Sequence, residues 1–510
     1  MDMILTGIVD ALTFSNIVFI MLGVMLGILV GAIPGLNGPM AITLAVPITY
    51  FMSPVTAIAF LIGINKGGSF GGSIAAVLLN TPGAPEAAAT CFDGYPLAKQ
   101  GKGIKAIKVA LYSSVFGDGF STLLVIFVAA PVASVALRLG PPEVCSIIIF
   151  SLTLIAALES DSLAKGVLSA AGGMLLSTVG MDPVTSLPRL TLDFYQLDSG
   201  FSVATIGVGL LALSELIVQG EEMKTSGRAV RVEEPRAPEG SDRKVTLREF
   251  LRTVPTLFRS SSIGCFVGML PGLGATIAAF LAYGVAKKFS KNPETFGTGN
   301  LIGVAAPESA NNAVGGSALI PLFSLGIPGN IASAILIGAF ILHGITPGPL
   351  MFAEHGRTVY AIYGSMIIGN ILNLACGYIG LSFFVKILSA PRAILYPILI
   401  SICISGAYIA DGSLFAVGTM ITFAFLGYFI KKLRFSFVSL IIGFVLGPLF
   451  ELSLQQTLIM SEMDITIMLR RPVSCIFIII TVLSIIRITW KKMRRTPGVN
   501  PHLSQQTDLS

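Results

Sequence analysis

Predominantly apolar blocks of about 18 to 25 residues recur along the whole chain, and each is long enough to cross a hydrocarbon core of about 30 Å as an α-helix. This feature limits the fold more than any other. Only 12% of the 510 residues are charged, whereas a soluble domain carries about 25%. The sequence therefore predicts an all-α, polytopic membrane protein that sits in a lipid bilayer.

The formal net charge of +6 does not indicate a nucleic-acid partner, because the basic residues collect in a few short loops. Such clustering is expected where Lys and Arg fix the cytoplasmic side of a membrane protein. The six cysteines are scattered, mostly within apolar blocks, and no CxxC spacing occurs. We interpret them as small buried apolar residues rather than as disulfide partners or metal ligands.

Three pairs of similar segments indicate an internal repeat. The pairs are GAIPGLNG at 31–38 with GMLPGLGA at 268–275, NKGGSFGGSIAAVLLNTPG at 65–83 with ANNAVGGSALIPLFSLGIPG at 310–329, and FSVATIGVGLLALSE at 201–215 with FSFVSLIIGFVLGPLFE at 435–451. The polar segment between the halves is expected to be solvated. The predicted units are a first membrane repeat at 1–219, a cytoplasmic linker at 220–255, a second repeat at 256–455, an extra C-terminal helix with a basic cytoplasmic end at 456–495, and a polar tail at 496–510.

The basic loops predict that the two repeats have opposite orientations in the membrane. In the first repeat the basic loop at 96–108 follows the second Pro-Gly motif, whereas in the second repeat the basic loop at 286–294 follows the first such motif. Since Lys and Arg favour the cytoplasmic side, both loops are expected there, which makes the repeats inverted. The segment 260–286 is expected to be a re-entrant hairpin folded at Pro271-Gly272.

Pro-Gly motifs interrupt the apolar blocks at matching places in both repeats. Backbone that leaves a helix inside a bilayer must be hydrogen-bonded by protein, water or a ligand. Free N–H groups at the resulting helix ends favour an anion, and free carbonyls favour a small cation. The broken helices therefore predict a solute-binding site near the middle of the membrane.

The predicted substrate site combines these breaks with the polar residues around them. Its residues are Pro34, Gly35, Asn37, Lys66, Gly71, Gly72, Ser73, Asn80, Thr81, Pro82, Gly83, Pro271, Gly272, Gly274, Asn311, Asn312, Gly315, Gly316, Ser317, Pro328 and Gly329. The predicted sodium ligands are Asn37, Asn80, Glu308 and Asn312. For an individual glycine, close helix packing is the alternative, because Gly67 and Gly71 have the four-residue spacing of packed helices.

Three charged residues within apolar blocks are candidates for a functional role or for structural pairing. Lys66 could contact a substrate carboxylate, pair with Glu308, or extend its charge to the interface. Glu308 could bind a cation, pair with Lys66, or be an interfacial carboxylate. Asp118 could be a ligand of the coupling ion or a structural partner.

Catalysis has little support in the sequence. His343 and His355 lie in a predicted outside loop, His502 lies in the polar tail, and no HExxH or Walker A motif occurs. Without an ATP site, transport would be driven by an ion gradient. The alternatives to transport are an ion or solute channel, a non-transporting membrane scaffold, and an intramembrane enzyme.

The motifs resemble those of a known family, the large membrane subunit of tripartite tricarboxylate transporters, or TctA family. The similar segments are GAIPGLNG, GGSFGGSIAAVLLNTPGAPEAAATCFDGYPLAKQGKG, GMLPGLGA and APESANNAVGGSALIPLFSLGIPG, and the resemblance extends over residues 15–455. It implies a bacterial inner-membrane secondary transporter that works with a small membrane subunit and a periplasmic solute-binding protein. It also implies organic carboxylates such as citrate as substrates, sodium as the coupling ion, and no other cofactor.

One stretch departs from the family pattern. This chain has GINKGGSFGGS at 63–73, where a tyrosine-rich GIYYGAMYGGS-like stretch is typical of the family. The cation that Lys66 adds beside Asn65 could suit a more acidic or differently shaped anion.

Overall fold

The computed structural model describes residues 2–158, 162–182, 185–226, 244–387 and 392–494, and this part of the chain is almost entirely helical. The elements of the first half are α1 (Asp2–Ala11), α2 (Phe14–Ala32), α3 (Gly38–Ala45), η1 (Val46–Phe51), α4 (Pro54–Leu79), η2 (Pro85–Ala87), α5 (Ala88–Lys99), α6 (Gly103–Ala136), α7 (Pro141–Leu158), α8 (Leu163–Ser177), β1 (Gly180–Met181), β2 (Pro188–Arg189), η3 (Tyr195–Leu197), α9 (Val203–Gly207), the π-helical η4 (Val208–Leu213) and α10 (Ser214–Ser226). The strands β1 and β2 pair antiparallel in a small hairpin.

The second half contains helices only, within the described ranges. They are α11 (Leu247–Met269), α12 (Gly274–Lys288), η5 (Pro293–Thr295), α13 (Leu301–Ser317), α14 (Leu319–Leu325), α15 (Ile331–Leu342), α16 (Met351–Glu354), α17 (Gly356–Ile379), α18 (Leu381–Ile387), α19 (Arg392–Asp411), α20 (Leu414–Lys432), α21 (Phe437–Met460), α22 (Ile467–Arg470) and α23 (Pro472–Arg494).

Six helical segments of the described chain are long and apolar enough to cross a membrane. They are 14–32, 103–136, 203–221, 356–379, 414–432 and 437–460, and shorter apolar helices lie between them. The prediction of an all-α, polytopic membrane protein is confirmed.

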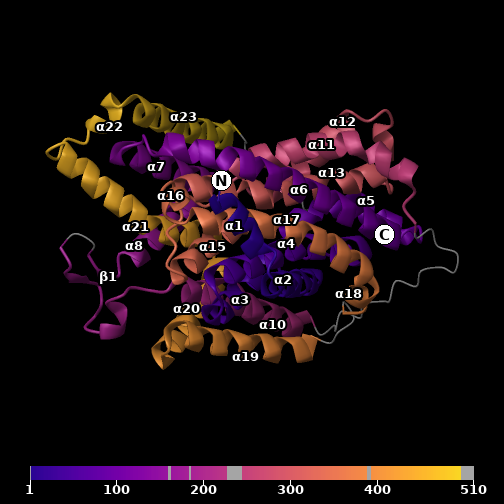
Figure 1. The fold of residues 1–510 in the computed structure, drawn as a ribbon, viewed down its shortest axis with the longest axis horizontal. Helices are drawn as coiled ribbons and strands as arrows, with labels where there is room; N and C mark the ends of the chain where they lie inside the picture. The colour runs from indigo at the N-terminus through magenta and orange to yellow at the C-terminus, as the bar shows by residue number, and fades with distance from the viewer. Residues whose placement is uncertain (1, 159–161, 183–184, 227–243, 388–391, 495–510) are drawn as a thin grey trace.

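The helices form a central group flanked by two smaller groups. The central group contains α2, α4, α5, α6, α11–α14 and α17, one flanking group contains α7, α8, α21 and α23, and the other contains α9, η4, α10, α19 and α20. Figure 1 shows α7 and α23 along one edge and α19 along the opposite edge, with α4, α15 and α17 between them. Helices α3 and α15 contact each other and connect the central group to the flanking groups.

Matching helices of the two halves make matching contacts. Helix α4 packs against α2 and α17, and α13 packs in the same way against α11 and α6. Glycines make the α2–α4 contact possible, because a Cβ atom on Gly67 would lie 2.2 Å from the carbonyl oxygen of Val24. Such close backbone approach is how helices associate in lipid, where apolar burial drives little.

The repeated motifs also have the same local geometry. Gly35 and Gly272, in the two PGL turns, have φ values of 87° and 86°, a region that favours glycine. Asn80 and Gly326, two residues before the other Pro-Gly motifs, are both left-handed, with φ values of 53° and 71°. The internal repeat seen in the sequence is therefore a repeat of backbone structure.

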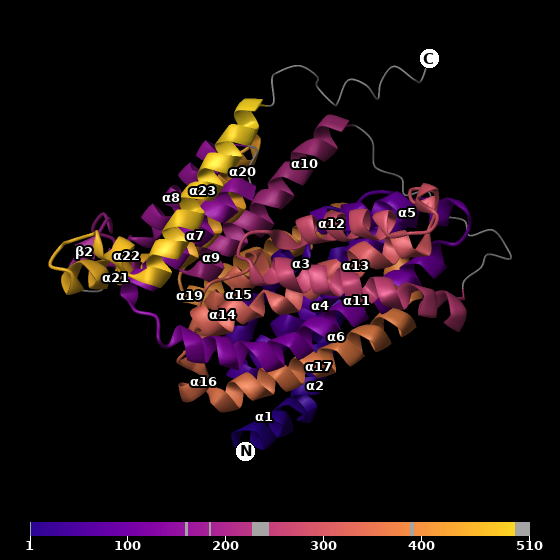
Figure 2. The ribbon, with the colours of Figure 1, turned by 90° about the horizontal axis from the view of Figure 1, so that it is seen from above.

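The basic loop at 96–108 and the segment between α12 and α13, which includes the basic loop at 286–294, lie together at one end of the molecule. The Gln100 side chain donates a hydrogen bond to the carbonyl oxygen of Thr298 at 2.7 Å. Close to the same end, Lys105 forms an ion pair with Glu249 at 2.6 Å. Figure 2 shows α5 and α12 at this end, far from the N-terminus and α16. The inverted orientation of the repeats in the membrane remains a prediction, with which this arrangement agrees.

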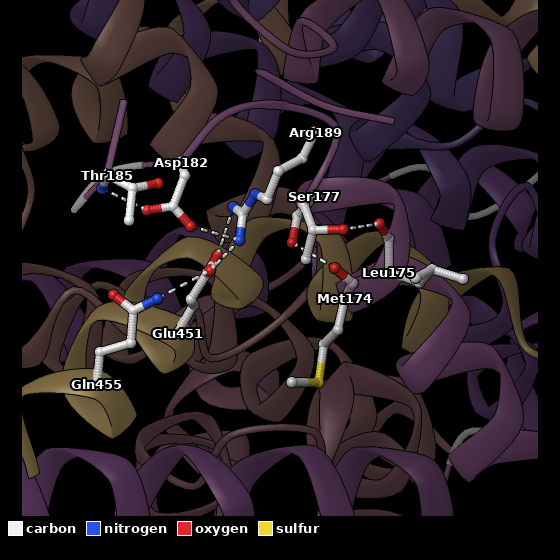
Figure 3. A network of polar contacts seen from close by, with 9 residues as sticks. Met174, Leu175, Ser177, Asp182, Thr185, Arg189, Glu451 and Gln455 are labelled. Atoms are coloured by element: carbon white, nitrogen blue, oxygen red, sulfur yellow. Dashed lines mark hydrogen bonds and ion pairs between the residues drawn. The ribbon is translucent and has the colours of Figure 1, made fainter. Parts of the chain in front are cut away.

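Two further sets of ion pairs join the two halves. Arg357 pairs with Asp10 at 2.6 Å. Arg189, on β2, lies between Asp182 and Glu451, at 2.9 and 2.5 Å (Figure 3). The acidic loop before α9 is thereby tied to Glu451 of α21.

Several boundaries differ from the sequence-based prediction. Helix α10 extends to Ser226 and α11 begins at Leu247, so both ends of the predicted linker at 220–255 are helical, and its positions 227–243 lie outside the described residues. The early start of α11 has a local cause, a capping box between Thr246 and Glu249. Residues 260–286 form a helical hairpin of α11 and α12 that turns at Pro271-Gly272, and its re-entry into the membrane stays a prediction. The predicted last helix is present as α23, and the tail at 496–510 lies outside the described residues.

Candidate functional site

Each of the four Pro-Gly breaks precedes the start of a new helical segment. The segments that follow are α3, η2 with α5, α12 and α15. Asn37 caps α3 by accepting a hydrogen bond from the N–H of Met40 at 3.0 Å. Asn330 caps α15 in a capping box with Ser333. The breaks thus present helix N-termini, which favour negative charge, inside an apolar protein.

Backbone groups at the breaks contact neighbouring backbone within each half. In the second half the two breaks bond each other, because the N–H of Gly272 donates to the carbonyl oxygen of Gly329 at 3.1 Å. In the first half the N–H of Gly83 donates to the carbonyl oxygen of Gly72, on α4, at 3.4 Å, a long and weak bond. A Cβ atom added to Gly83 would also lie 2.3 Å from the carbonyl oxygen of Gly31, at the end of α2 before the Pro34-Gly35 break. Part of the backbone freed by the breaks is therefore satisfied by nearby backbone, as the membrane interior requires.

The two halves meet at Asn65 of α4. A Cβ atom added to Gly38 would lie 3.8 Å from Asn65 Oδ1, and one added to Gly315 would lie 3.5 Å from Asn65 Nδ2. Asn65 therefore stands between α3 and α13. Asn65, Asn37 and Gly315 are half-buried, whereas most of their neighbours along these helices are buried. An amide side chain and backbone groups from both halves are thus partly accessible at this place.

Lys66, next to Asn65, points elsewhere. Its ammonium forms an ion pair with Asp118 of α6, and both side chains are buried. The amide of Asn370, on α17, lies beside this pair, with Oδ1 at 3.3 Å from the Lys66 nitrogen. With the amide turned over, its nitrogen would donate to Asp118 and its oxygen would accept from the N–H of Gly119 at 2.9 Å. Of the roles left open for Asp118, the structure shows the structural one, and Lys66 pairs with Asp118 rather than with Glu308.

Glu308 lies in the second half, on α13, and is fully buried. Its carboxylate accepts hydrogen bonds from the hydroxyls of Thr90, on α5, and Ser114, on α6, the latter at 3.1 Å. The hydroxyl of Ser73, on α4, also faces this carboxylate but does not reach hydrogen-bond geometry. Glu308 is therefore not an interfacial residue, because helices from the first half surround it.

Other predicted residues have local roles. Asn80 is exposed and forms the left-handed end of α4, and Thr81, also exposed, bonds the carbonyl of Leu79. Asn312 donates to the carbonyl of Glu308 in its own helix at 3.0 Å. The predicted sodium ligands Asn37, Asn80 and Asn312 thus serve as caps or bond their own helix.

The remaining predicted residues fall into two groups. Several are placed by packing: Gly71 against α2, Gly72 against Ala84 and Ala87, Gly316 against Ser121, and Ser317 against Gly268. Others lie at or beside the breaks, where Pro34, Gly35, Pro82 and Gly274 are half-buried and Gly83, Pro271, Gly272, Pro328 and Gly329 are buried. Asn311 is buried with an unpartnered Nδ2.

Sequence reasoning did not single out Thr90, Ser114 or Asn370. Ser114 precedes Asp118 by one helical turn, so both lie on one face of α6. That spacing was a usable signal, because polar residues on one face of a membrane helix indicate a polar contact. For Thr90 and Asn370 we find no comparable signal.

Comparison with known proteins gives a clear result for the family. A model described as "Tripartite tricarboxylate transporter TctA family" matches residues 17–442. The chain belongs to the TctA family. It is therefore a multi-pass subunit of a tricarboxylate transporter, and the tripartite organisation of such transporters implies partner subunits.

Two relatives come from Agrobacterium vitis. The chain is 35% identical over 468 residues to an uncharacterized 52.8 kDa protein in the TAR-I ttuC' 3' region, and the match covers 92% of each chain. It is 39% identical over 211 residues to an uncharacterized protein in the TAR-II ttuC' 3' region, covering 41% of this chain and 87% of the relative. No solved structure matches the chain.

Proposed function

We propose that the chain is the translocating subunit of a secondary transporter that imports organic carboxylates of the di- and tricarboxylate class across the bacterial inner membrane. One observation carries this proposal: all four Pro-Gly breaks precede helical segments that begin inside the protein, and the two breaks of the second half are hydrogen-bonded to each other. Helix N-termini favour carboxylate groups. Membership of the TctA family supports the same substrate class.

The substrate would bind where Asn65 separates α3 from α13. The Asn65 amide can donate to a carboxylate, and the start of α3 at Gly38 and the half-buried Gly315 add backbone from both halves. Lys66 is engaged by Asp118, so it would act on the substrate only at a distance. The breaks at Pro34-Gly35 and Pro271-Gly272 would complete the site in the proposed arrangement.

The proposed cycle is alternating access driven by a sodium gradient. A periplasmic solute-binding protein would deliver the carboxylate to the outer face, and a small membrane subunit would complete the complex. The central and flanking helix groups are the natural moving parts, since α3 and α15 connect them. No catalytic step is assigned to the chain.

Uptake by reconstituted transporter tests this proposal. The chain and its small subunit are placed in proteoliposomes, and uptake of radiolabelled citrate is measured with and without an inward sodium gradient and the cognate solute-binding protein. We expect uptake to need both, Asn65→Ala to abolish it, and Thr422→Ala, on the exposed face of α20, to preserve it. Uptake that needs neither, or a steady ionic current typical of a channel, would contradict the proposal.

A further inference from the structure

A buried carboxylate lies among hydroxyl groups from three different helices. Glu308, on α13, accepts hydrogen bonds from Thr90 and Ser114, and Ser73 faces it from α4. The three hydroxyl residues are at most 1% exposed. We propose that Glu308, Ser73, Thr90 and Ser114 form a sodium-ion site between the two halves of the chain.

The first argument is the charge balance around Glu308. A buried carboxylate is unfavourable unless it is paired with positive charge or neutralised. In the described part of the chain, no basic side chain forms an ion pair with Glu308, and the buried cation Lys66 is bound to Asp118. The surroundings of Glu308 therefore call for a bound cation.

The second argument is the arrangement of oxygen atoms. Sodium is a hard cation that prefers oxygen ligands, and hydroxyls, carboxylates and backbone carbonyls supply them. Ser73 is fully buried and its hydroxyl makes no hydrogen bond, which leaves an oxygen free to coordinate. One carboxylate with neutral oxygens also suits a monovalent ion better than Ca²⁺, which takes more carboxylates.

The third argument is the position of the four residues. Ser73, Thr90 and Ser114 belong to α4, α5 and α6 of the first half, and Glu308 belongs to α13 of the second. Ser73 and Thr90 flank the Pro82-Gly83 break. A cation bound by these four residues would connect α13 to the first half beside that break. The affinity of the site for the cation would therefore depend on how the two halves are arranged. This inference rests on the proposed function for its role in transport, although cation binding is measured separately.

Sodium binding to the purified chain is the test. Binding of ²²Na⁺ and thermal unfolding are measured in detergent, in NaCl and in choline chloride of equal ionic strength. We expect sodium to bind wild-type protein and to raise its unfolding temperature. Glu308→Gln should weaken binding about tenfold or more, as expected when an interaction with a charged group is lost. Ser114→Ala should weaken it by a smaller factor.

A matched control and a second variant keep the test decisive. Glu143→Gln removes another buried carboxylate, on α7, which is paired with Arg471 at 3.6 Å, and it should leave sodium binding unchanged. If Glu308→Gln does not fold, sodium binding by Ser114→Ala and Ser73→Ala tests the proposal instead. The proposal is overturned if wild-type protein does not bind sodium, or if the variants bind it as wild type does. It is also overturned if protons, and not sodium, stabilise the protein through Glu308.

The two proposals fail in different ways. Sodium-dependent citrate uptake that Glu308→Gln and Ser114→Ala leave intact would refute the sodium site while the proposed function stands. Sodium binding that depends on Glu308, in a transporter that takes up no carboxylate, would refute the function while the site stands.

Discussion

Asp93→Ala is expected to detach the glycine-rich loop before α13 from α5. One carboxylate oxygen of Asp93 accepts three backbone hydrogen bonds, from Gly297 at 2.9 Å, Gly299 at 2.9 Å and Asn300 at 2.7 Å. The other oxygen accepts from the Tyr283 hydroxyl at 2.9 Å. Asp93 is fully buried, and it joins the first half to the second through these bonds.

The size of the effect follows from the donors that lose their acceptor. A buried unsatisfied donor costs about 1–3 kcal/mol. Gly297 is exposed, so water can replace the carboxylate there, and the other three donors, at about 1–3 kcal/mol each, together account for about 3–9 kcal/mol. Asp93→Asn keeps an oxygen for the three backbone donors, but it removes the charge and replaces the acceptor of the Tyr283 hydroxyl with an NH2 group, so it should cost less, about 1–3 kcal/mol. Since whole domains are stable by about 5–15 kcal/mol, the alanine variant should be close to unfolding.

Thermal unfolding in detergent and limited proteolysis of the 290–300 loop measure both effects. The expected order of stability is wild type, then Asp93→Asn, then Asp93→Ala, with the loop cleaved fastest in the alanine variant. Glu294→Ala, at an exposed acidic residue of the same loop, is the control and should behave as wild type. Equal stability of Asp93→Ala and wild type, or unchanged cleavage of the loop, would refute the reasoning.

Three further predictions concern helix packing, the buried ion pair and pH. Gly67→Ala should strongly reduce the yield of folded protein in membranes, because its Cβ would lie 2.2 Å from a backbone oxygen of α2, whereas Gly172→Ala, with no atom within 4 Å, should not. Lys66→Met and Asp118→Asn should each destabilise by about 3–5 kcal/mol, and a double replacement by apolar residues should recover most of this in thermal unfolding; additive losses would contradict the pairing. The hydrogen bond from Lys105 lowers the pKa of Glu249 to about 2 from 4.5. The ionised Glu249 should therefore stabilise the folded protein fully above about pH 4.5, and this contribution should be lost as the pH falls towards 2. The thermal unfolding temperature of Glu249→Gln should not show this loss of stability as the pH falls.

The parts of the fold that depend on local sequence were predictable. Pro-Gly motifs in apolar blocks break helices because proline removes a donor and glycine accepts a positive φ, as Gly35 and Gly272 do. The repeat of these motifs predicted that their geometry would recur. The ends of α10 and α11 were less predictable, because the capping box of Thr246 and Glu249 extends α11 into a polar region.

The site was only partly predictable, because its contacts join residues far apart in the sequence. Lys66 and Asp118 are 52 positions apart, and their pairing depends on how α4 and α6 are rotated against each other. Ser114 contacts Glu308 across the two halves, which no local pattern reveals. Asn37 and Asn80 were predicted as sodium ligands from their residue type. In the structure the Asn37 side chain caps the start of α3, and Asn80 takes the left-handed conformation at the end of α4. Asparagine is common at both kinds of helix end, so residue type alone does not separate a cap from a ligand.

The most direct test of the whole account is the sidedness of the 96–108 loop and of the segment between α12 and α13, which includes the basic loop at 286–294. Single cysteines replace Gln100 and Thr298 in a chain whose native cysteines are changed to alanine, and a membrane-impermeant thiol reagent is applied to spheroplasts and to inverted vesicles. Both positions are exposed and lie in contact in the structure. The account predicts labelling of both only in inverted vesicles, and a short cross-link between them in the double variant. Labelling of the two positions from opposite sides would contradict the inverted arrangement and the shared site that depends on it.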